Sequence, residues 1–216
     1  MGDMNVIGTS VKRKEDYRFL TGAGNYTDDI TLPHQSYACF VRSPHAHAKI
    51  KGIKKDKALK APGVLAIYTG EDWTAAKVGG LPCGWLITDV AGQPMKEPLH
   101  PCLAQGKANH VGDQIAVVIA ETYNQAKDAA ELVEVDYEVL PAVVDVGSAL
   151  KKGAPQIHEA APGNTCYVWA LGDKGATDKA FASAAHVTKL DFINNRLVPN
   201  AIEPRAVNAS YTRHDE

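Results

Sequence analysis

Histidine is the first residue type in this sequence whose spacing suggests chemistry. His45 and His47 stand two residues apart in a predicted strand, so both rings would project from one face. A pair at this spacing can bind a metal ion, but a metal site needs at least a third ligand. His34, His100 and His110 are available, yet no pattern in the sequence brings them together. We therefore favour histidines that hydrogen-bond at a strand edge over a metal site.

Carboxylates form the second candidate group. Glu134, Asp136 and Glu138 alternate with apolar residues, and Glu131 precedes them. The alternation places the three on one solvent-facing side of a strand, where carboxylates more often serve solubility than acid–base chemistry. Further along the chain, Arg205 is predicted to pair with a carboxylate in a structural role.

A glycine pair and the cysteines complete the search for a site. Gly22 and Gly24 resemble a phosphate-binding loop, but acidic residues and a proline follow instead of a helix N-terminus, so we interpret them as a turn. The four cysteines form no C-x-x-C pair, which disfavours a zinc or iron–sulfur site and favours free thiols. They are Cys39, Cys83, Cys102 and Cys166. No G-x-S-x-G motif is present. The residues alone therefore assign no catalytic, cofactor-binding or metal-binding side chain.

The composition and charge of the chain indicate which kinds of partner and location to expect. The chain has 216 residues, of which 45% are hydrophobic and 22% charged, and its formal net charge is −2. This balance gives no reason to expect nucleic acid or an anionic membrane as a partner. No window reaches the roughly 18 apolar residues of a membrane-spanning helix, and no signal peptide is visible. These features predict a soluble, cytoplasmic domain.

The first half of the chain predicts strands around turns. Residues 37–41 and 45–53 are expected as strands separated by a proline, and 64–68 as a short buried strand after a Pro-Gly turn. Residues 70–109 contain so many glycines and prolines that long regular elements are not expected there.

The clearest unit covers residues 113–140. Apolar residues occupy both faces of 115–120, which indicates a central strand. Thr122 with Gln125 then predicts the N-terminus of a helix, whose small buried face comprises Ala126, Ala129, Ala130 and Val133. A half-exposed strand follows at 133–139. Strand, helix and strand in this order suggest a right-handed crossover unit, so the predicted fold class is α/β or α+β.

The last third predicts the beginning of a second domain. We expect a short helix near 145–150, a boundary at about residue 150, a helix over 177–185 with Phe181 on its buried side, and strands at 186–194 and 205–211. One helix and two strands make a poor independent domain, so residues 151–216 are interpreted as an incomplete one.

Several segments resemble the large subunits of molybdenum hydroxylases, the xanthine oxidase, aldehyde oxidase and aerobic CO dehydrogenase family. They run in order along nearly the whole chain: RFLTGAGNYTDDI (18–30), FVRSPHAHAKI (40–50), APGV (61–64), HVGDQIAVVIA (110–120), VDYEVLPAV (135–143) and NRLVPNAIEPRA (195–206).

The resemblance implies an α/β hammerhead domain over residues 1–150 and the start of the first molybdopterin-binding domain over 151–216. It also implies an oxidoreductase that hydroxylates an aldehyde or N-heterocycle, or oxidises CO. Its molybdenum would be held by molybdopterin cytosine dinucleotide. A small [2Fe-2S] subunit and a medium FAD subunit would be its partners, and the complex could dimerise.

The family's glycine-rich molybdenum-site segment and catalytic glutamate are expected downstream of Glu216. We therefore expect this chain alone to be inactive and to serve packing and subunit assembly. Two alternatives stay open at this point. One is a free-standing, non-catalytic hammerhead module that acts as a binding or assembly partner. The other is an unrelated small-molecule-binding domain with residues 70–109 as its lid.

Overall fold

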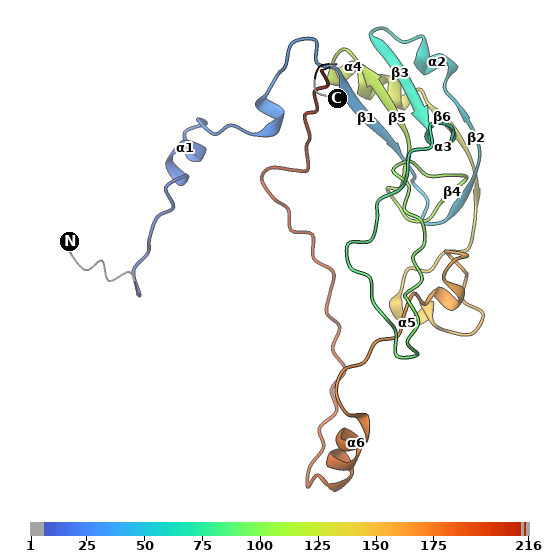
Figure 1. Ribbon diagram of the computed structural model, residues 1–216. Helices are drawn as coiled ribbons and strands as arrows, with labels where there is room; N and C mark the ends of the chain where they lie inside the picture. The colour runs from blue at the N-terminus through green and yellow to red at the C-terminus, as the bar shows by residue number, and fades with distance from the viewer. Residues whose placement is uncertain (1–6, 213, 215–216) are drawn as a thin grey trace. The chain divides into compact units, whose positions relative to one another are not determined.

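Two compact units make up the chain. The computed structural model describes residues 7–212 and 214. Ser36–Val187 forms one unit, here called the sheet unit, and Met1–Gln35 with Thr188–Glu216 forms the other, here called the terminal unit. The strands and most of the helices lie in the sheet unit (Figure 1).

The first sheet has three antiparallel strands in the order β1-β5-β3. These are β1 (Tyr37–Arg42), β5 (Gln114–Ala120) and β3 (Val64–Thr69). β5 is central and most of its residues are buried, which confirms the prediction from its two apolar faces. Phe40 and Tyr68 both pair with Val117, so the three side chains lie in one row across the sheet.

The second sheet has the order β4-β2-β6 and is also antiparallel. These are β4 (Lys107–Ala108), β2 (Ala48–Lys54) and β6 (Glu134–Val139). β6 alternates between exposed and half-buried residues along most of its length, as predicted. The predicted crossover unit is wrong, because β5 and β6 belong to different sheets. The helix between them carries the chain from one sheet to the other, and the fold is mixed helix and sheet of the α+β kind.

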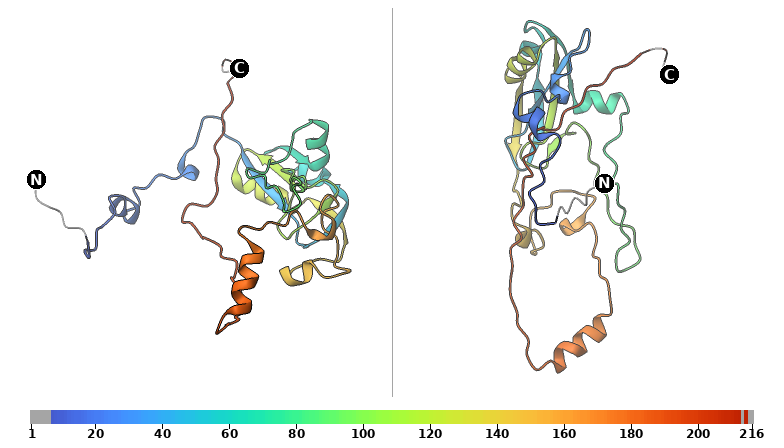
Figure 2. Two further views of the ribbon diagram at one scale, coloured as in Figure 1. Left: turned by 60° about the horizontal axis from the view of Figure 1, so that its bottom comes forward. Right: turned by 90° about the vertical axis from the view of Figure 1, so that its left-hand side faces the viewer.

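Helix α4 (Tyr123–Glu131) connects the sheets and covers the first one. The Thr122 hydroxyl accepts a hydrogen bond from the Gln125 backbone N–H, so the predicted N-cap is confirmed. Ala126 and Ala129 are fully buried on the predicted small-residue face. α4 packs on β1 and β5 (Figures 1 and 2) and, with α2 (Asp56–Leu59), encloses a core containing Val118.

The segment from 70 to 109 is largely irregular, as expected, but it begins with a helix that the sequence analysis missed. This is α3 (Gly70–Ala75), where the Asp72 carboxylate accepts hydrogen bonds from the backbone N–H (2.7 Å) and the hydroxyl (2.9 Å) of Thr69. After β6, the short helix α5 (Val146–Ala149) begins at its cap Asp145, as predicted.

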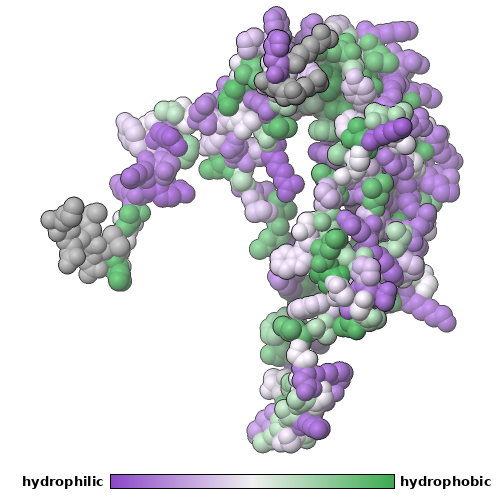
Figure 3. Space-filling model, viewed as in Figure 1, coloured by the Kyte–Doolittle hydropathy of each residue, from purple (hydrophilic) through white to green (hydrophobic). Residues whose placement is uncertain are grey.

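The predicted elements beyond residue 170 differ most from the structure. α6 (Lys174–Ser183) forms, but it has no buried residue, and Phe181 is exposed rather than packed. The strands predicted at 186–194 and 205–211 are absent from the described residues, which are extended and exposed there. Hydrophobic side chains lie open along this extended segment (Figure 3). An alternating sequence becomes a strand only beside a partner strand, and none of the described strands pairs with it.

The terminal unit contains α1 (Asp16–Leu20) and the 3-10 turn η1 (Thr27–Asp29), which the sequence analysis treated as loop. Glu203 accepts hydrogen bonds from the Thr27 N–H and hydroxyl, each at 2.9 Å. Asn208 donates to the carbonyls of Thr27 and Ile30. Side-chain hydrogen bonds therefore join the two ends of the chain. None of the helices described here has the length and apolar character that crossing a bilayer requires.

Candidate functional site

The histidine pair does not form one site. His45 and His47 lie in the turn before β2, not within the strand, so the premise that they share a strand face is wrong. His45 packs edge-on against Tyr137, with ring centroids 5.0 Å apart. His47 is 5% exposed, and its Nδ1 lies 2.7 Å from the carbonyl oxygen of Pro141. The two rings therefore hold the start of β2 against β6 and the chain that follows it.

The protonation of His47 follows from this contact. A carbonyl only accepts, so Nδ1 carries the proton and donates, and Nε2 keeps its lone pair when the ring is neutral. Nε2 is buried and has no hydrogen-bond partner among the described residues.

A cavity of about 280 Å³ with several polar side chains in its lining lies at the edge of the second sheet. We call it the histidine–lysine pocket; the polar residues that line it are His100, Gln105, Lys107, Asn109, His110, Asp113 and His158. His100 and His110, which no sequence pattern connects, both line this cavity. No three His, Cys, Asp or Glu side chains in residues 7–212 and 214 are placed to hold a metal ion.

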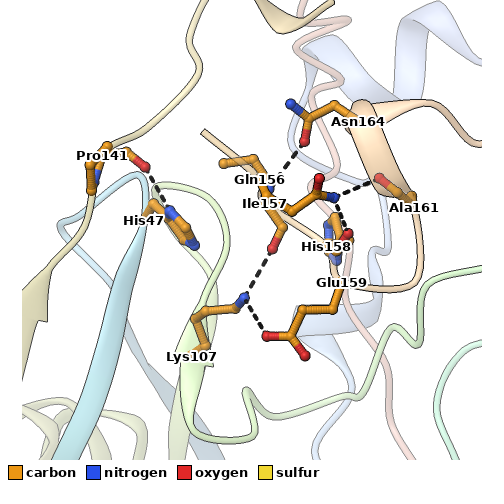
Figure 4. Close-up of polar contacts among 9 residues, drawn as sticks. All are labelled: His47, Lys107, Pro141, Gln156, Ile157, His158, Glu159, Ala161 and Asn164. Atoms are coloured by element: carbon orange, nitrogen blue, oxygen red, sulfur yellow. Dashed lines mark hydrogen bonds and ion pairs between the residues drawn. The ribbon is translucent and has the colours of Figure 1, made fainter. Parts of the chain in front are cut away.

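Lys107 joins the pocket to a loop at residues 155–164. Its Nζ donates to the Ile157 carbonyl at 3.0 Å and lies 3.7 Å from a carboxylate oxygen of Glu159 (Figure 4). Asn164 stabilises the same loop. Its side-chain nitrogen donates to the carbonyls of Ala149 and Pro155, and its side-chain oxygen accepts from the Ile157 N–H. The loop is therefore ordered by its own hydrogen bonds, and it brings His158 to the pocket.

Charge in the pocket acts against protonation of His158. Burial lowers the pKa of this imidazole, and Lys107, His47 and His100 lower it further, while Asp113 acts in the opposite direction. The Asp113 carboxylate accepts from the Asn109 backbone N–H at 2.9 Å and lies 3.6 Å from His110 Nδ1. The arrangement offers hydrogen-bond donors to a ligand and contains no activated nucleophile.

Lys107, Asn109 and His158 were missed as site residues by the sequence analysis. Lys107 follows the irregular segment and His158 lies in a proline- and glycine-rich stretch, about 50 residues further along. No local motif links them, because only the pairing of β4 and the folding of the loop bring them together.

A second cavity is apolar and lies on the face of the first sheet opposite α4. We call it the apolar groove; it has a volume of about 510 Å³ and is lined by Phe40, Tyr68, Trp73, Leu81, Val117 and Ile119, among others. Val117 and Val118 point to opposite faces by strand alternation, and Val118 packs under α4. Phe40 and Tyr68 remain 40% and 46% exposed. A sheet with one face covered by a helix thus leaves its other apolar face open.

Two of the candidate carboxylates, Glu134 and Glu138, pair with lysines of β2 and α2. Glu134 forms ion pairs with Lys57 (2.8 Å) and Lys54 (3.9 Å). Glu138 forms them with Lys51 (3.4 Å) and Lys49 (3.7 Å). These pairs are exposed, as the surface interpretation predicted, and pairs of this kind contribute little to stability.

The remaining candidates have structural surroundings. Glu203, not Arg205, makes the structural contacts in its segment, and no ion pair of Arg205 lies within residues 7–212 and 214. Gly22 has φ 73° in a turn after α1, and a Cβ at Gly24 would lie 2.7 Å from the Phe19 ring. This segment is a turn, as predicted, and does not cradle a phosphate. The four cysteines are free.

Comparison with known proteins agrees with this architecture. Residues 21–141 match the family model described as aldehyde oxidase and xanthine dehydrogenase, a/b hammerhead domain. The chain is 39% identical to the carbon monoxide dehydrogenase large chain of Afipia carboxidovorans, over 91% of this chain and 24% of that protein. It is 34% identical to the nicotine 6-hydroxylase large subunit of Paenarthrobacter nicotinovorans, over 96% of this chain and 24% of that protein.

A solved structure gives the same result. The crystal structure of a Cu,Mo-CO dehydrogenase superposes with a TM-score of 0.65 at 38% identity, over 83% of this chain and 23% of that one. The chain thus spans about a quarter of the length of these relatives. With the family model matched over more than half of its residues, the chain belongs to the aldehyde oxidase and xanthine dehydrogenase family, of which it carries the a/b hammerhead domain.

Proposed function

We propose that this chain is the N-terminal portion of the large subunit of a molybdenum-dependent oxidoreductase that oxidises CO or hydroxylates an aldehyde or N-heterocycle. Its role is packing and subunit assembly, and catalysis resides in domains beyond this chain. Residues 1–150 are the hammerhead domain and 151–216 begin the first molybdopterin-binding domain. The names of its relatives support the reaction class, since they include CO dehydrogenase and nicotine 6-hydroxylase large subunits.

The apolar groove is the observation that carries the assembly role. Large exposed aromatic and aliphatic side chains next to one another usually mark a surface that another part of a protein covers. The exposed segment from 188 to 212 supports the same role, because Phe192, Ile193, Leu197 and Ile202 are all more than 80% exposed there. Both surfaces would be covered by the remainder of the large subunit.

The proposed cofactor does not fit the residues of this chain by themselves. A molybdopterin dinucleotide carries phosphates, which need backbone N–H groups in an open, glycine-rich cradle. The candidate phosphate loop of the sequence, at Gly22 and Gly24, is a turn closed by Phe19. The molybdopterin cytosine dinucleotide is therefore assigned to the full-length subunit, and no chemical step is assigned to residues of this chain.

The proposal extends to partners and location. The names of the relatives, a large chain and a large subunit, imply further subunits. We propose a small [2Fe-2S] subunit and a medium FAD subunit as these partners, in a cytoplasmic complex that could form dimers. The DNA downstream of the Glu216 codon tests this part of the proposal. A molybdopterin-binding continuation beside flavin and iron–sulfur subunit genes is the expected result.

A biochemical test uses the native host. The chain, tagged at its N-terminus and purified without denaturant, should bring with it molybdenum, iron and flavin in fixed ratios, together with oxidation of CO, an aldehyde or an N-heterocycle. A metal-free, flavin-free monomer, with unrelated genes downstream, would overturn the proposal. The chain would then be a free-standing hammerhead module.

A further inference from the structure

The histidine–lysine pocket holds hydrogen-bond donors without partners. Lys107 Nζ has three N–H bonds and contacts only the Ile157 carbonyl and Glu159, so one remains available. The imidazole nitrogens of His158 and His100 have no hydrogen-bond partner within the described part of the chain. Asp113, the carboxylate in the pocket wall, already accepts from the Asn109 backbone N–H and neighbours His110. The free donors are therefore one N–H of Lys107 and one N–H of each neutral imidazole, and the buried Oδ1 of Asn109 is a free acceptor in the same lining.

Among the groups that act on His158, those that carry or can carry positive charge outnumber the carboxylates. Three groups that carry or can carry positive charge surround His158, namely Lys107, His47 and His100, and Asp113 is the opposing charge among the groups that act on it. Lys107 is 24% exposed at its side chain, so its charge is only partly screened by water. Protonated imidazoles add their charge to that of Lys107, and together they attract an anion.

We propose that the histidine–lysine pocket binds a small oxyanion, a carboxylate or phosphate group, through Lys107, His158 and His100. A cavity of about 280 Å³ is at the lower limit of ordinary small-molecule sites, so it takes one small molecule and not a dinucleotide. Leu99 and Pro101 add an apolar wall for the carbon part of the ligand. This inference goes beyond the proposed function, because it concerns a ligand of this chain's own residues.

Binding is expected to depend on pH. A bound anion favours the protonated imidazole, so it raises the pKa of His158, which burial and its positive neighbours hold down in the free pocket. By linkage, the same anion binds more tightly as the pH falls through the pKa of His158 in the complex. Glu159, which lies beside Lys107, and Asp113 are the nearby carboxylates that oppose the anion.

The test follows the His158 imidazole by NMR in the full chain, over a pH series, while inorganic phosphate or acetate is added at constant ionic strength. Chloride alone is the reference. The variant His158→Gln identifies the resonance. Lys107→Gln removes the charge but keeps a donor for the Ile157 carbonyl, and Lys174→Gln on the exposed helix α6 is the matched control.

A saturable rise in the pKa of His158 is expected with at least one of the two anions. The anion's affinity should fall about tenfold or more in Lys107→Gln, the order expected for loss of a charged hydrogen bond, and stay unchanged in Lys174→Gln. Phosphate alone, acetate alone or both would each support the site and define the oxyanion it accepts. No saturable response beyond that of chloride, or an equal response in Lys107→Gln, would overturn the proposal.

Discussion

Gly70 allows a close approach between two segments of the sheet unit. A Cβ at this position would lie 2.1 Å from the carbonyl oxygen of Ala104 and 2.9 Å from its carbonyl carbon. Such atoms do not approach within 3.0 Å in real structures, so Gly70→Ala requires a shift of about 1 Å. Ala104 cannot move freely, since its N–H donates to the Gln114 carbonyl on β5 at 2.7 Å and Leu103 beside it is 1% exposed.

We expect Gly70→Ala to lower the free energy of unfolding by about 1–3 kcal/mol, the usual cost of overpacking a core. For a chain of this size, each kcal/mol lowers Tm by roughly 2–4 °C. Urea unfolding followed by tryptophan fluorescence measures the loss, with Trp73 in α3 close to the change. Gly52→Ala is the matched control, because no atom lies within 4 Å of its added Cβ. Equal unfolding midpoints for the two variants would refute the close approach of α3 to Ala104.

Three further predictions test the helix ends and the apolar groove. Thr122→Ala removes the cap of α4 and should lower the free energy of unfolding by about 1 kcal/mol, whereas Thr122→Ser should keep most of it; urea unfolding checks both. The pKa of Asp72 is lowered by the Thr69 backbone N–H, the Thr69 hydroxyl and Lys55. The stability that this carboxylate adds is therefore present above its unfolded pKa near 3.8. It is lost as the pH falls through the pKa of Asp72 in the folded protein. Asp72→Asn should make the free energy of unfolding depend less on pH in this acidic range. If the variant loses stability with falling pH as the original protein does, Asp72 is not the group responsible. Phe40→Ser should reduce binding of a hydrophobic dye to the isolated chain more than Leu132→Ser, since Leu132 lies at the end of α4 and outside the groove; equal dye binding would show that the groove is not the exposed apolar surface.

Local sequence patterns predicted the positions of helices and strands better than which strands pair with one another. The two apolar faces of 115–120 and the Thr122 cap identified β5 and α4, because burial and capping depend on neighbouring residues in the chain. The same patterns implied that β5 and β6 share a sheet, which is wrong. Alternation reports how a strand is exposed and says nothing about which strand lies beside it, so the pairing of β6 with β2 was not predictable.

The contacts of the candidate site residues were likewise not predictable from local patterns. The two-residue spacing of His45 and His47 predicted that both rings lie on one strand face, but the strand begins at Ala48. His45 packs against Tyr137, and His47 hydrogen-bonds to the carbonyl of Pro141. α3 was missed because glycines dominate its surroundings, although Thr69 followed three residues later by Asp72 is a usable helix-start signal. Lys107 and His158 meet only through the folded loop at 155–164, and no spacing in the sequence encodes that contact.

The pairing of the lysines of β2 with the glutamates of β6 bears on how this protein behaves at high concentration. β6 is an edge strand, whose outer backbone groups could template a β-strand from another molecule. The lysines offset the charges of Glu134 and Glu138, so the repulsion of a second β6 arriving edge to edge comes mainly from Asp136, for which no ion pair is found among the described residues. Salt screens this repulsion over a Debye length of about 8 Å at physiological ionic strength. The protein should therefore stay dispersed best in dilute buffer, and concentrated salt should favour dimers that pair two β6 edges.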